Sequence, residues 1–323
     1  MVLWKEGAKV REREVLERIR AIFDATHISS ETARKIIVGN GDDGAVLRLS
    51  EETVLSIDMA VEGIHFRTAW SAPEEIGRKV TAANLADICA MGGWPEYLLV
   101  SVAFPSSYLN SLEKLAEGIA KEAEKVGARV IGGDLSQGNE LVISITAIGK
   151  TSQPILRSGA NVGDAVVVSH LPGFSAVGLT LLSQDRETDK EVERRAVSQH
   201  CAPVIDYSHY RGAFEYLTSA TDISDGLIVD ASHIAEASSV AFEIDTSKFE
   251  LHADFEWLKV LGGSKAQAIE FVLTGGEDHV LLGTTPTPEK IQGFLEIGRV
   301  ITGHGIYVDG KKRDAETGYQ HNW

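Results

Sequence analysis

Short apolar stretches typical of β-strands alternate along this chain with amphipathic stretches that have helical spacing. In the first half, an apolar strand is expected over 97–104 and a helix from Leu112 to Val126. In the second half, a strand that runs into Asp222 precedes a helix over 227–237. The alternation predicts a mixed α/β fold, because each helix can cover a face of a neighbouring sheet.

A polar stretch over 150–163 separates two blocks of this kind. The length of 323 residues suits two domains, since a domain averages about 150 residues. We expect the boundary near residue 155, with an N-terminal domain over 1–155 and a C-terminal domain over 156–323.

The charge balance limits the partners that the chain can have. The sequence has 47 acidic and 31 basic side chains, which gives a formal net charge of −16. Such a surface repels nucleic acid and anionic membranes, so neither is an expected partner. An anionic substrate would need bound cations beside it.

The two cysteines lie far apart in the sequence, and we see neither a signal peptide nor a membrane-spanning run, so a cytoplasmic location is expected.

Acidic residues recur in glycine-rich turns beside apolar strands, a place where both backbone and side chain can approach a ligand. A single Asp-Gly turn is more often structural, but the pattern occurs five times. The acidic positions are Asp42 and Asp43, Asp58, Asp134, Asp222 and Asp225, and Glu277 and Asp278.

A helix expected from Pro73 adds Asn84 and Asp87, which are three residues apart and share one face. Carboxylates, amides and hydroxyls are hard oxygen ligands of the kind that Mg²⁺ prefers. The ensemble predicts a site for several cations.

Two glycine motifs resemble nucleotide-binding loops and are rejected. The segment 39–44 has G-x-G-x-x-G spacing, but a strand-like stretch follows it where a dinucleotide fold needs a helix. The segment 149–151 ends like a P-loop but lacks the glycine five positions earlier.

Three further residues have two open interpretations each. His65 is structural or lies at the site, Arg157 is a surface charge or a phosphate contact, and the tail with Tyr319 packs or faces a ring.

In these motifs the sequence resembles the thiamine-monophosphate kinases of the aminoimidazole-ribonucleotide-synthetase superfamily. The resemblance spans most of the chain and keeps the family's order. It rests on 41–43, Val61 to Phe66, Asn84 to Gly92, Gly132 to Asp134, Asp222 to Leu227, and Gly275 to Asp278.

The resemblance implies the two-domain α/β fold of that superfamily, with an N-terminal sheet that pairs with a second subunit in a homodimer and a C-terminal domain that completes the ATP cleft. It also implies several Mg²⁺ ions, with ATP and thiamine monophosphate as substrates. By matching position, the ATP contacts would be Gly133, Asp134, Arg157 and Ser224. The thiamine monophosphate contacts would be His65, Glu277 and Tyr319. The Mg²⁺ ligands would be Asp43, Ser56, Ile57, Asp58, Asp87, Asp134, Asp222 and Asp225.

The chain departs from the family pattern at three places. Ile57 stands where the family commonly has Thr, so only its backbone could serve as a ligand. Leu135 and Ser136 replace two Thr after Gly-Gly-Asp, and His279 replaces a Tyr.

The implied reaction needs no general base, because a phosphate monoester with a second pKa of about 6 is already anionic near neutral pH. The chemical task is to bring two polyanions into line, which cations assist. Three alternatives stay open at this stage: another ATP-dependent synthetase such as aminoimidazole ribonucleotide synthetase, a metal-dependent phosphohydrolase, and a non-catalytic divalent-cation-binding protein. The last would be expected to show EF-hand spacing, which we do not find.

Overall fold

The structure is a computed structural model that describes residues 15, 17–40, 45–49, 52–186, 188 and 190–314. Of the expected site residues, Asp43 and Tyr319 lie outside the described residues. The chain forms two compact units. Unit 1 comprises Met1–Ile88 and Trp94–Thr151, and unit 2 comprises Cys89–Gly93 and Ser152–Trp323.

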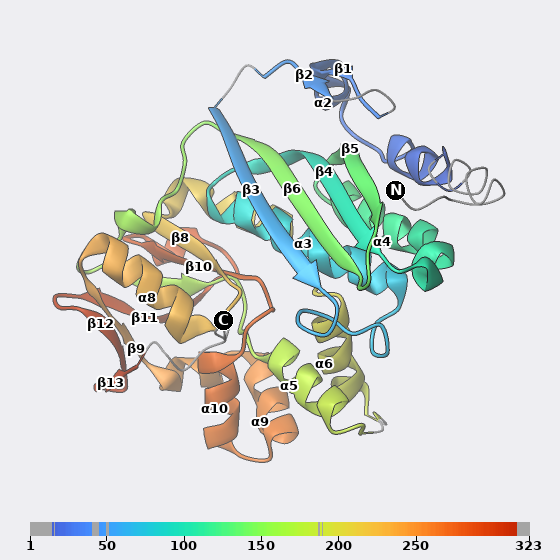
Figure 1. Ribbon diagram of the computed structural model, residues 1–323. Coiled ribbons are helices and arrows are strands. Elements are labelled where there is room, and N and C mark those ends of the chain that lie inside the picture. Colours follow the sequence, from blue (N-terminus) through green and yellow to red (C-terminus); the bar gives the residue numbers. More distant parts are fainter. Residues whose placement is uncertain are drawn as a thin grey trace. The chain divides into compact units, whose positions relative to one another are not determined.

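Unit 1 is built on a four-stranded sheet in the order β3-β6-β4-β5, with α3 (Pro73–Ala90) and α4 (Leu112–Glu124) on one face (Figure 1). The β3–β6 and β4–β6 pairs are antiparallel, and β4–β5 is parallel. The strands are β3 (Glu52–Val61), β4 (Trp94–Phe104), β5 (Arg129–Gln137) and β6 (Val142–Thr151).

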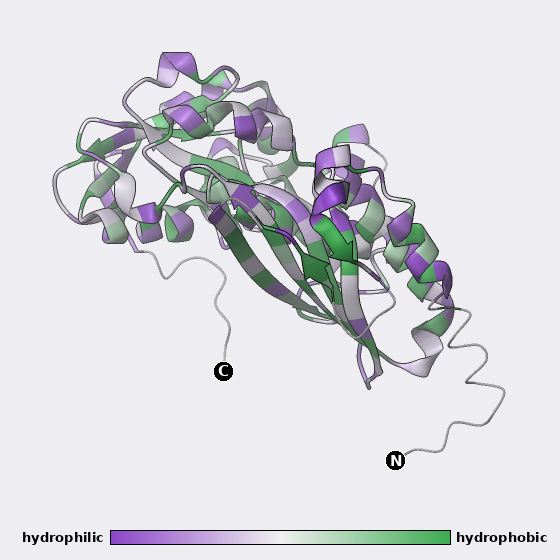
Figure 2. Cartoon of the chain, turned by 90° about the horizontal axis from the view of Figure 1, so that it is seen from above, coloured by the Kyte–Doolittle hydropathy of each residue, from purple (hydrophilic) through white to green (hydrophobic). Residues whose placement is uncertain are grey.

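Alternation along the strands explains this layering, because successive side chains point to opposite faces of a sheet. In β6, Ile143, Ile145 and Ala147 are fully buried, and the residues between them are only half-buried. The same banding of hydrophobic and less hydrophobic residues is visible along the strands in Figure 2. The helices α3 and α4 cross closely: a Cβ at Gly77 would lie 2.2 Å from the Leu115 carbonyl oxygen, so that position requires glycine.

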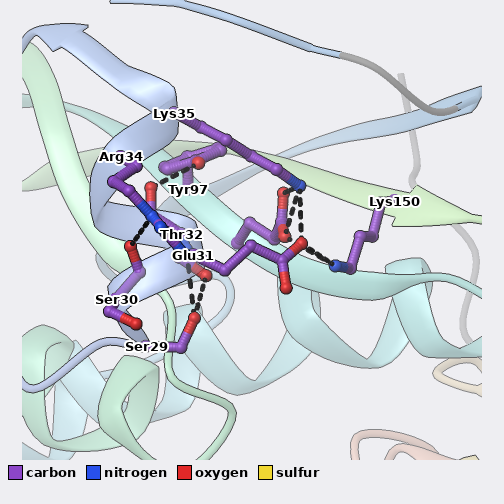
Figure 3. Close-up of polar contacts among 9 residues, drawn as sticks. Ser29, Ser30, Glu31, Thr32, Arg34, Lys35, Tyr97 and Lys150 are labelled. Carbon is purple, nitrogen blue, oxygen red and sulfur yellow. Dashed lines mark hydrogen bonds and ion pairs between the residues drawn. The ribbon is translucent and has the colours of Figure 1, made fainter.

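The segment before the sheet contains a helix over residues 17–24, α2 (Ser30–Lys35) and the short strands β1 (Ile36–Val38) and β2 (Val46–Leu47). Ion pairs dock this segment on the sheet (Figure 3). Lys35 Nζ lies 3.2 Å from the buried carboxylate of Glu96, and Lys150 Nζ lies 3.2 Å from Glu31. The Tyr97 hydroxyl donates to the Thr32 carbonyl over 2.9 Å.

Unit 2 contains a seven-stranded, mostly antiparallel sheet in the order β13-β12-β9-β11-β7-β10-β8. Two of its interior strands, β7 (Ala165–Val168) and β10 (Val280–Thr285), are almost wholly buried, and they pack in one hydrophobic core with the helices around the sheet. The other strands are β8 (Ser219–Ile223), β9 (Ala241–Ile244), β11 (Leu295–Ile301), β12 (Gly305–Val308) and β13 (Lys311–Arg313). The helices are α5 (Phe174–Ser183), α6 (Glu191–Cys201), α7 (Tyr207–Ala213), α8 (Leu227–Ser238), α9 (Ala253–Gly262) and α10 (Lys265–Thr274). The predicted mixed α/β class is confirmed. No helix among the described residues has the length and apolar character needed to span a bilayer.

Candidate functional site

In unit 1, the predicted metal ligands of β3 meet the acidic face of α3. The Ser56 hydroxyl donates to the Asp87 carboxylate over 2.5 Å, and the Asp58 backbone N–H donates to the Asn84 side-chain oxygen over 3.1 Å. Asn84 is fully buried, while Ser56, Asp58 and Asp87 are half-buried and accessible to a ligand. The prediction that Asn84 and Asp87 share one helix face is confirmed.

Ile57 points to the opposite face of β3 from its two neighbours. Its side chain is 66% exposed, and it lies in line with Leu55 and Met59, which are 64% and 58% exposed. The aliphatic side chain of Ile57 has no donor atom, so only its backbone is available to a ligand on the face of Ser56 and Asp58.

Asp58 and Asp134 were expected in glycine-rich turns beside apolar strands, and this expectation is wrong. Both lie inside strands, since β3 continues to Val61 and β5 continues to Gln137. They occupy the two edge strands of the sheet, so their backbones are separated by roughly 14 Å at about 4.8 Å per strand spacing. At these mid-strand positions Asp134 is exposed and Asp58 is half-buried.

Gly133 allows the edge strand β5 to lie close to β4. A Cβ at this position would lie 1.8 Å from the Val100 carbonyl oxygen, so no other residue fits without moving the backbone. The adjacent Asp134 is exposed, and Ser136 donates a hydrogen bond to its carboxylate over 3.1 Å.

His65 lies in a tight turn that follows β3. Gly63 takes a positive φ of 84°, and its N–H donates to the Phe66 carbonyl over 2.7 Å. His65 Nδ1 accepts from the Val61 N–H over 3.1 Å, so a neutral ring carries its proton on Nε2. The turn thus fixes both the orientation and the tautomer of this ring.

In unit 2, a second acidic turn follows β8. The buried Asp230 carboxylate accepts backbone N–H groups from Ser224, Asp225 and Gly226 at 3.0, 3.0 and 3.1 Å. Burial, and then the charge of Asp222, raise the pKa of Asp230 to about 8. Asp230 therefore holds the turn in the shape that presents Ser224 and Asp225.

The Asp222 side chain lies on β8 beside His279. His279 Nδ1 is 3.0 Å from Asp222 Oδ2, and both residues are buried. Arg157, in a short 3-10 turn, donates from Nη2 to the Thr221 hydroxyl over 3.2 Å and so lies next to the same strand.

The segment 275–279 packs directly against the turn after β8. The Glu277 N–H donates to the Ser224 carbonyl over 2.8 Å, and a Cβ at Gly276 would lie 2.2 Å from that same oxygen. Asp278 is buried and accepts from the Gly173 and Ser175 N–H groups at 2.6 and 3.0 Å. Burial raises the pKa of Asp278 to about 6 against the opposing effect of these bonds.

The donor set fits Mg²⁺. Among the described residues no three His, Cys, Asp or Glu side chains converge as a cage. Mg²⁺ does not need one, because it takes one or two carboxylates and completes its shell with water and substrate phosphates. Paired oxygen donors such as Ser56 and Asp87 match that requirement.

Several residues that shape the site were missed from the sequence. Asp230 binds three backbone N–H groups, and Ser175 and His200 contact each other beside Glu277. Asp278 was among the expected acidic positions, but its bonds to the Gly173 and Ser175 N–H groups were not expected. The sequence offered a signal for Asp278, which lies in a glycine-rich acidic motif, and for Asp230, which lies in the first turn of α8. It offered no signal for His200, because the contact of His200 with Glu277 depends on how α5 and α6 pack.

The comparisons with known proteins agree with this geometry. Residues 41–151 match the family described as AIR synthase related protein, N-terminal domain. The thiamine-monophosphate kinase of Aquifex aeolicus is 33% identical over 93% of this chain and 97% of its own length. That of Mycobacterium tuberculosis is 37% identical over 98% of this chain and 96% of its own length.

A solved structure, AaThiL complexed with AMPPCP and TMP, superimposes with a TM-score of 0.79 at 33% identity and covers 86% of this chain and 89% of that chain. The similarity therefore extends over both units rather than over a single motif. The chain belongs to the thiamine-monophosphate kinase family.

Proposed function

We propose that this enzyme transfers the γ-phosphoryl group of ATP directly to the phosphate of thiamine monophosphate, giving thiamine diphosphate and ADP. The observation that carries the proposal is full-length identity of 33% and 37% to two thiamine-monophosphate kinases, together with a related structure complexed with AMPPCP and TMP.

The chain's own residues provide oxygen donors and rigid turns, and the reaction needs no general base from them, since the acceptor phosphate is anionic. Bound Mg²⁺ would supply positive charge between the two polyanions and so support in-line transfer. Ser56, Asp58 and Asp87 in unit 1, and Asp222 and Asp225 in unit 2, hold oxygen donors in place for it. Asp43, Asp134 and the Ile57 backbone complete the proposed metal set.

The remaining proposed contacts are with the two substrates. Gly133, Asp134, Arg157 and Ser224 bind ATP. His65, Glu277 and Tyr319 bind thiamine monophosphate. In this proposal the N-terminal domain, 1–155, provides metal sites and the subunit interface, and the C-terminal domain, 156–323, completes the site.

We also propose a homodimer formed through the sheet of unit 1. Its edge strand β3 presents the exposed side chains of Leu55, Ile57 and Met59 in a row. An apolar edge strand invites pairing with another chain, and a second copy would bury these side chains. The two free, buried cysteines support a cytoplasmic location for the enzyme.

The test is a product assay with three acceptor conditions. Purified protein is incubated with Mg-ATP and thiamine monophosphate, free thiamine, or no acceptor, and products are separated by chromatography. Thiamine diphosphate formed only from the monophosphate supports the proposal. ADP and free phosphate in all three conditions would identify a phosphohydrolase instead.

A further inference from the structure

Two side chains from other elements of unit 2 lie close to Nδ1 of His200. The Ser175 hydroxyl on α5 lies 3.1 Å from this nitrogen, and Glu277 Oε2 lies 3.4 Å from it. Ser175 is 1% exposed and His200 5% exposed, whereas the Glu277 side chain is 33% exposed. A buried pair of polar residues thus supports one carboxylate that reaches solvent.

The surrounding backbone is built to hold this arrangement. Glu277 has a φ of 62°, in the left-handed region that is unfavourable for a non-glycine residue. Asp278 fixes the next position by binding the first N–H groups of α5. Gly178 lets α6 approach α5, since a Cβ there would lie 2.2 Å from the Ala196 carbonyl oxygen.

The contact with Glu277 also selects the form of the imidazole. A carboxylate oxygen accepts only, so the favourable state of His200 carries a proton on Nδ1. One oxygen of Glu277 is then directed toward His200, and the carboxylate cannot rotate freely. Without the His200 N–H, Glu277 would stay in place, but its side chain would have more conformational freedom. Binding a ligand would then cost more conformational entropy.

We propose that His200 is a positioning residue that orients the Glu277 carboxylate toward the positively charged ring of thiamine monophosphate. This rests on the proposed function. A carboxylate repels the phosphate end of that substrate, while the thiazolium ring carries a fixed positive charge that attracts it. His200 therefore governs affinity for the organic half of the acceptor, and leaves ATP binding and phosphoryl transfer unaffected.

The test compares His200→Leu with His200→Asn, two side chains of similar size. Asn presents an N–H donor near the position of Nδ1, and Leu presents none. We expect His200→Leu to raise KM for thiamine monophosphate up to about tenfold, the cost of ordering one side chain on binding, with kcat and KM for ATP within about twofold. His200→Asn should restore KM to within about threefold of the unmodified enzyme. The matched control is His304→Leu, which changes an exposed histidine of the same unit.

A second readout does not depend on turnover. Binding of thiamine monophosphate, measured by calorimetry, should weaken in His200→Leu, whereas binding of a thiophene analogue without the ring charge should be the same in both proteins.

If His200→Leu does not fold, Glu277→Asp tests the same contact from the exposed side, because it withdraws the carboxylate from Nδ1 by one methylene and keeps its charge. It too should raise KM for thiamine monophosphate and spare KM for ATP.

Unchanged affinity for thiamine monophosphate in His200→Leu, or in Glu277→Asp where the Leu variant does not fold, overturns the inference. Equal loss for the charged substrate and the neutral analogue overturns it as well. Failure of the proposed function looks different, because then the unmodified enzyme itself forms no thiamine diphosphate.

Discussion

The hydroxyl of Ser56 on β3 donates a hydrogen bond of 2.5 Å to the carboxylate of Asp87 on α3. This contact joins residues 31 positions apart and orients both oxygens on the side of the edge strand that faces α3. Asn84, one turn earlier on α3, binds the backbone of Asp58 at the same edge. The helix therefore sets the spacing of the unit 1 oxygen donors.

Asp87→Asn should keep the hydrogen bond with Ser56 but remove a negative charge from the proposed metal site. We expect kcat/KM to fall at least about a hundredfold and the half-saturating Mg²⁺ concentration to rise, with little change in stability. Steady-state kinetics over a Mg²⁺ titration measure both. Asp185→Asn, an exposed aspartate whose left-handed φ Asn tolerates, is the control. Equal Mg²⁺ dependence in Asp87→Asn and the control would remove Asp87 from the metal site.

Asp278 should make the stability of unit 2 depend on pH. Its pKa is raised by burial to about 6, above the ordinary value of 3.8, so the folded state binds its proton more tightly than the unfolded state does. Its stabilisation is complete below about pH 4 and is lost as the pH rises to about 6, by at most roughly 3 kcal/mol. Urea unfolding between pH 4 and pH 7 measures the slope. Asp278→Asn should flatten this slope, because the amide does not titrate and carries no buried charge at pH 7. An identical slope in the variant would refute this assignment.

Gly276→Ala should uncouple the segment 275–279 from the turn after β8. The added Cβ would lie 2.2 Å from the Ser224 carbonyl oxygen, so the backbone of one segment must move. A cost of about 1–3 kcal/mol and a loss of most activity are expected, measured by urea unfolding and by product formation. Gly212→Ala on α7 meets no atom within 4 Å and should be neutral or slightly stabilising. Similar behaviour of both variants would mean that the segments are not held by this close approach.

Leu55→Lys combined with Met59→Lys should prevent dimer formation through β3. Both side chains are exposed in the single chain, so the monomer should keep its stability while two charges oppose burial in an interface. Sedimentation velocity on the purified protein gives the oligomeric state. Leu251→Lys, at the most exposed of the large hydrophobic residues in unit 2, should leave it unchanged. A dimer that survives the double change must use another surface.

The sequence predicts local features of this fold well and distant contacts poorly. The helix from Pro73 and the strand that ends near Asp222 follow from periodicity and glycine stops, and the structure confirms both. The helices α6 and α10 were not expected. Residues 271–273 were expected as an apolar strand before the acidic turn, and this is wrong, because they form the end of α10. The order of the seven strands in unit 2 depends on pairing between segments far apart in the chain, which no local pattern encodes.

The same limit applies to the candidate site. Acidic motifs identified the residues of the two turns, but Asp58 and Asp134 lie mid-strand because pairing with β6 and β4 extends β3 and β5 beyond them. Asp230 and His200 act through contacts that only the packed helices create. Composition and spacing therefore predict oxygen donors for a cation, and packing decides which side chains hold those donors in place.

The most direct test of the central claim follows a labelled γ-phosphoryl group. The enzyme is given Mg-ATP labelled in that group together with thiamine monophosphate, and label in each product is counted over a time course. Direct transfer predicts label in thiamine diphosphate at one per ADP formed, and none in inorganic phosphate. Label that accumulates in inorganic phosphate, with unchanged thiamine monophosphate, would contradict the account.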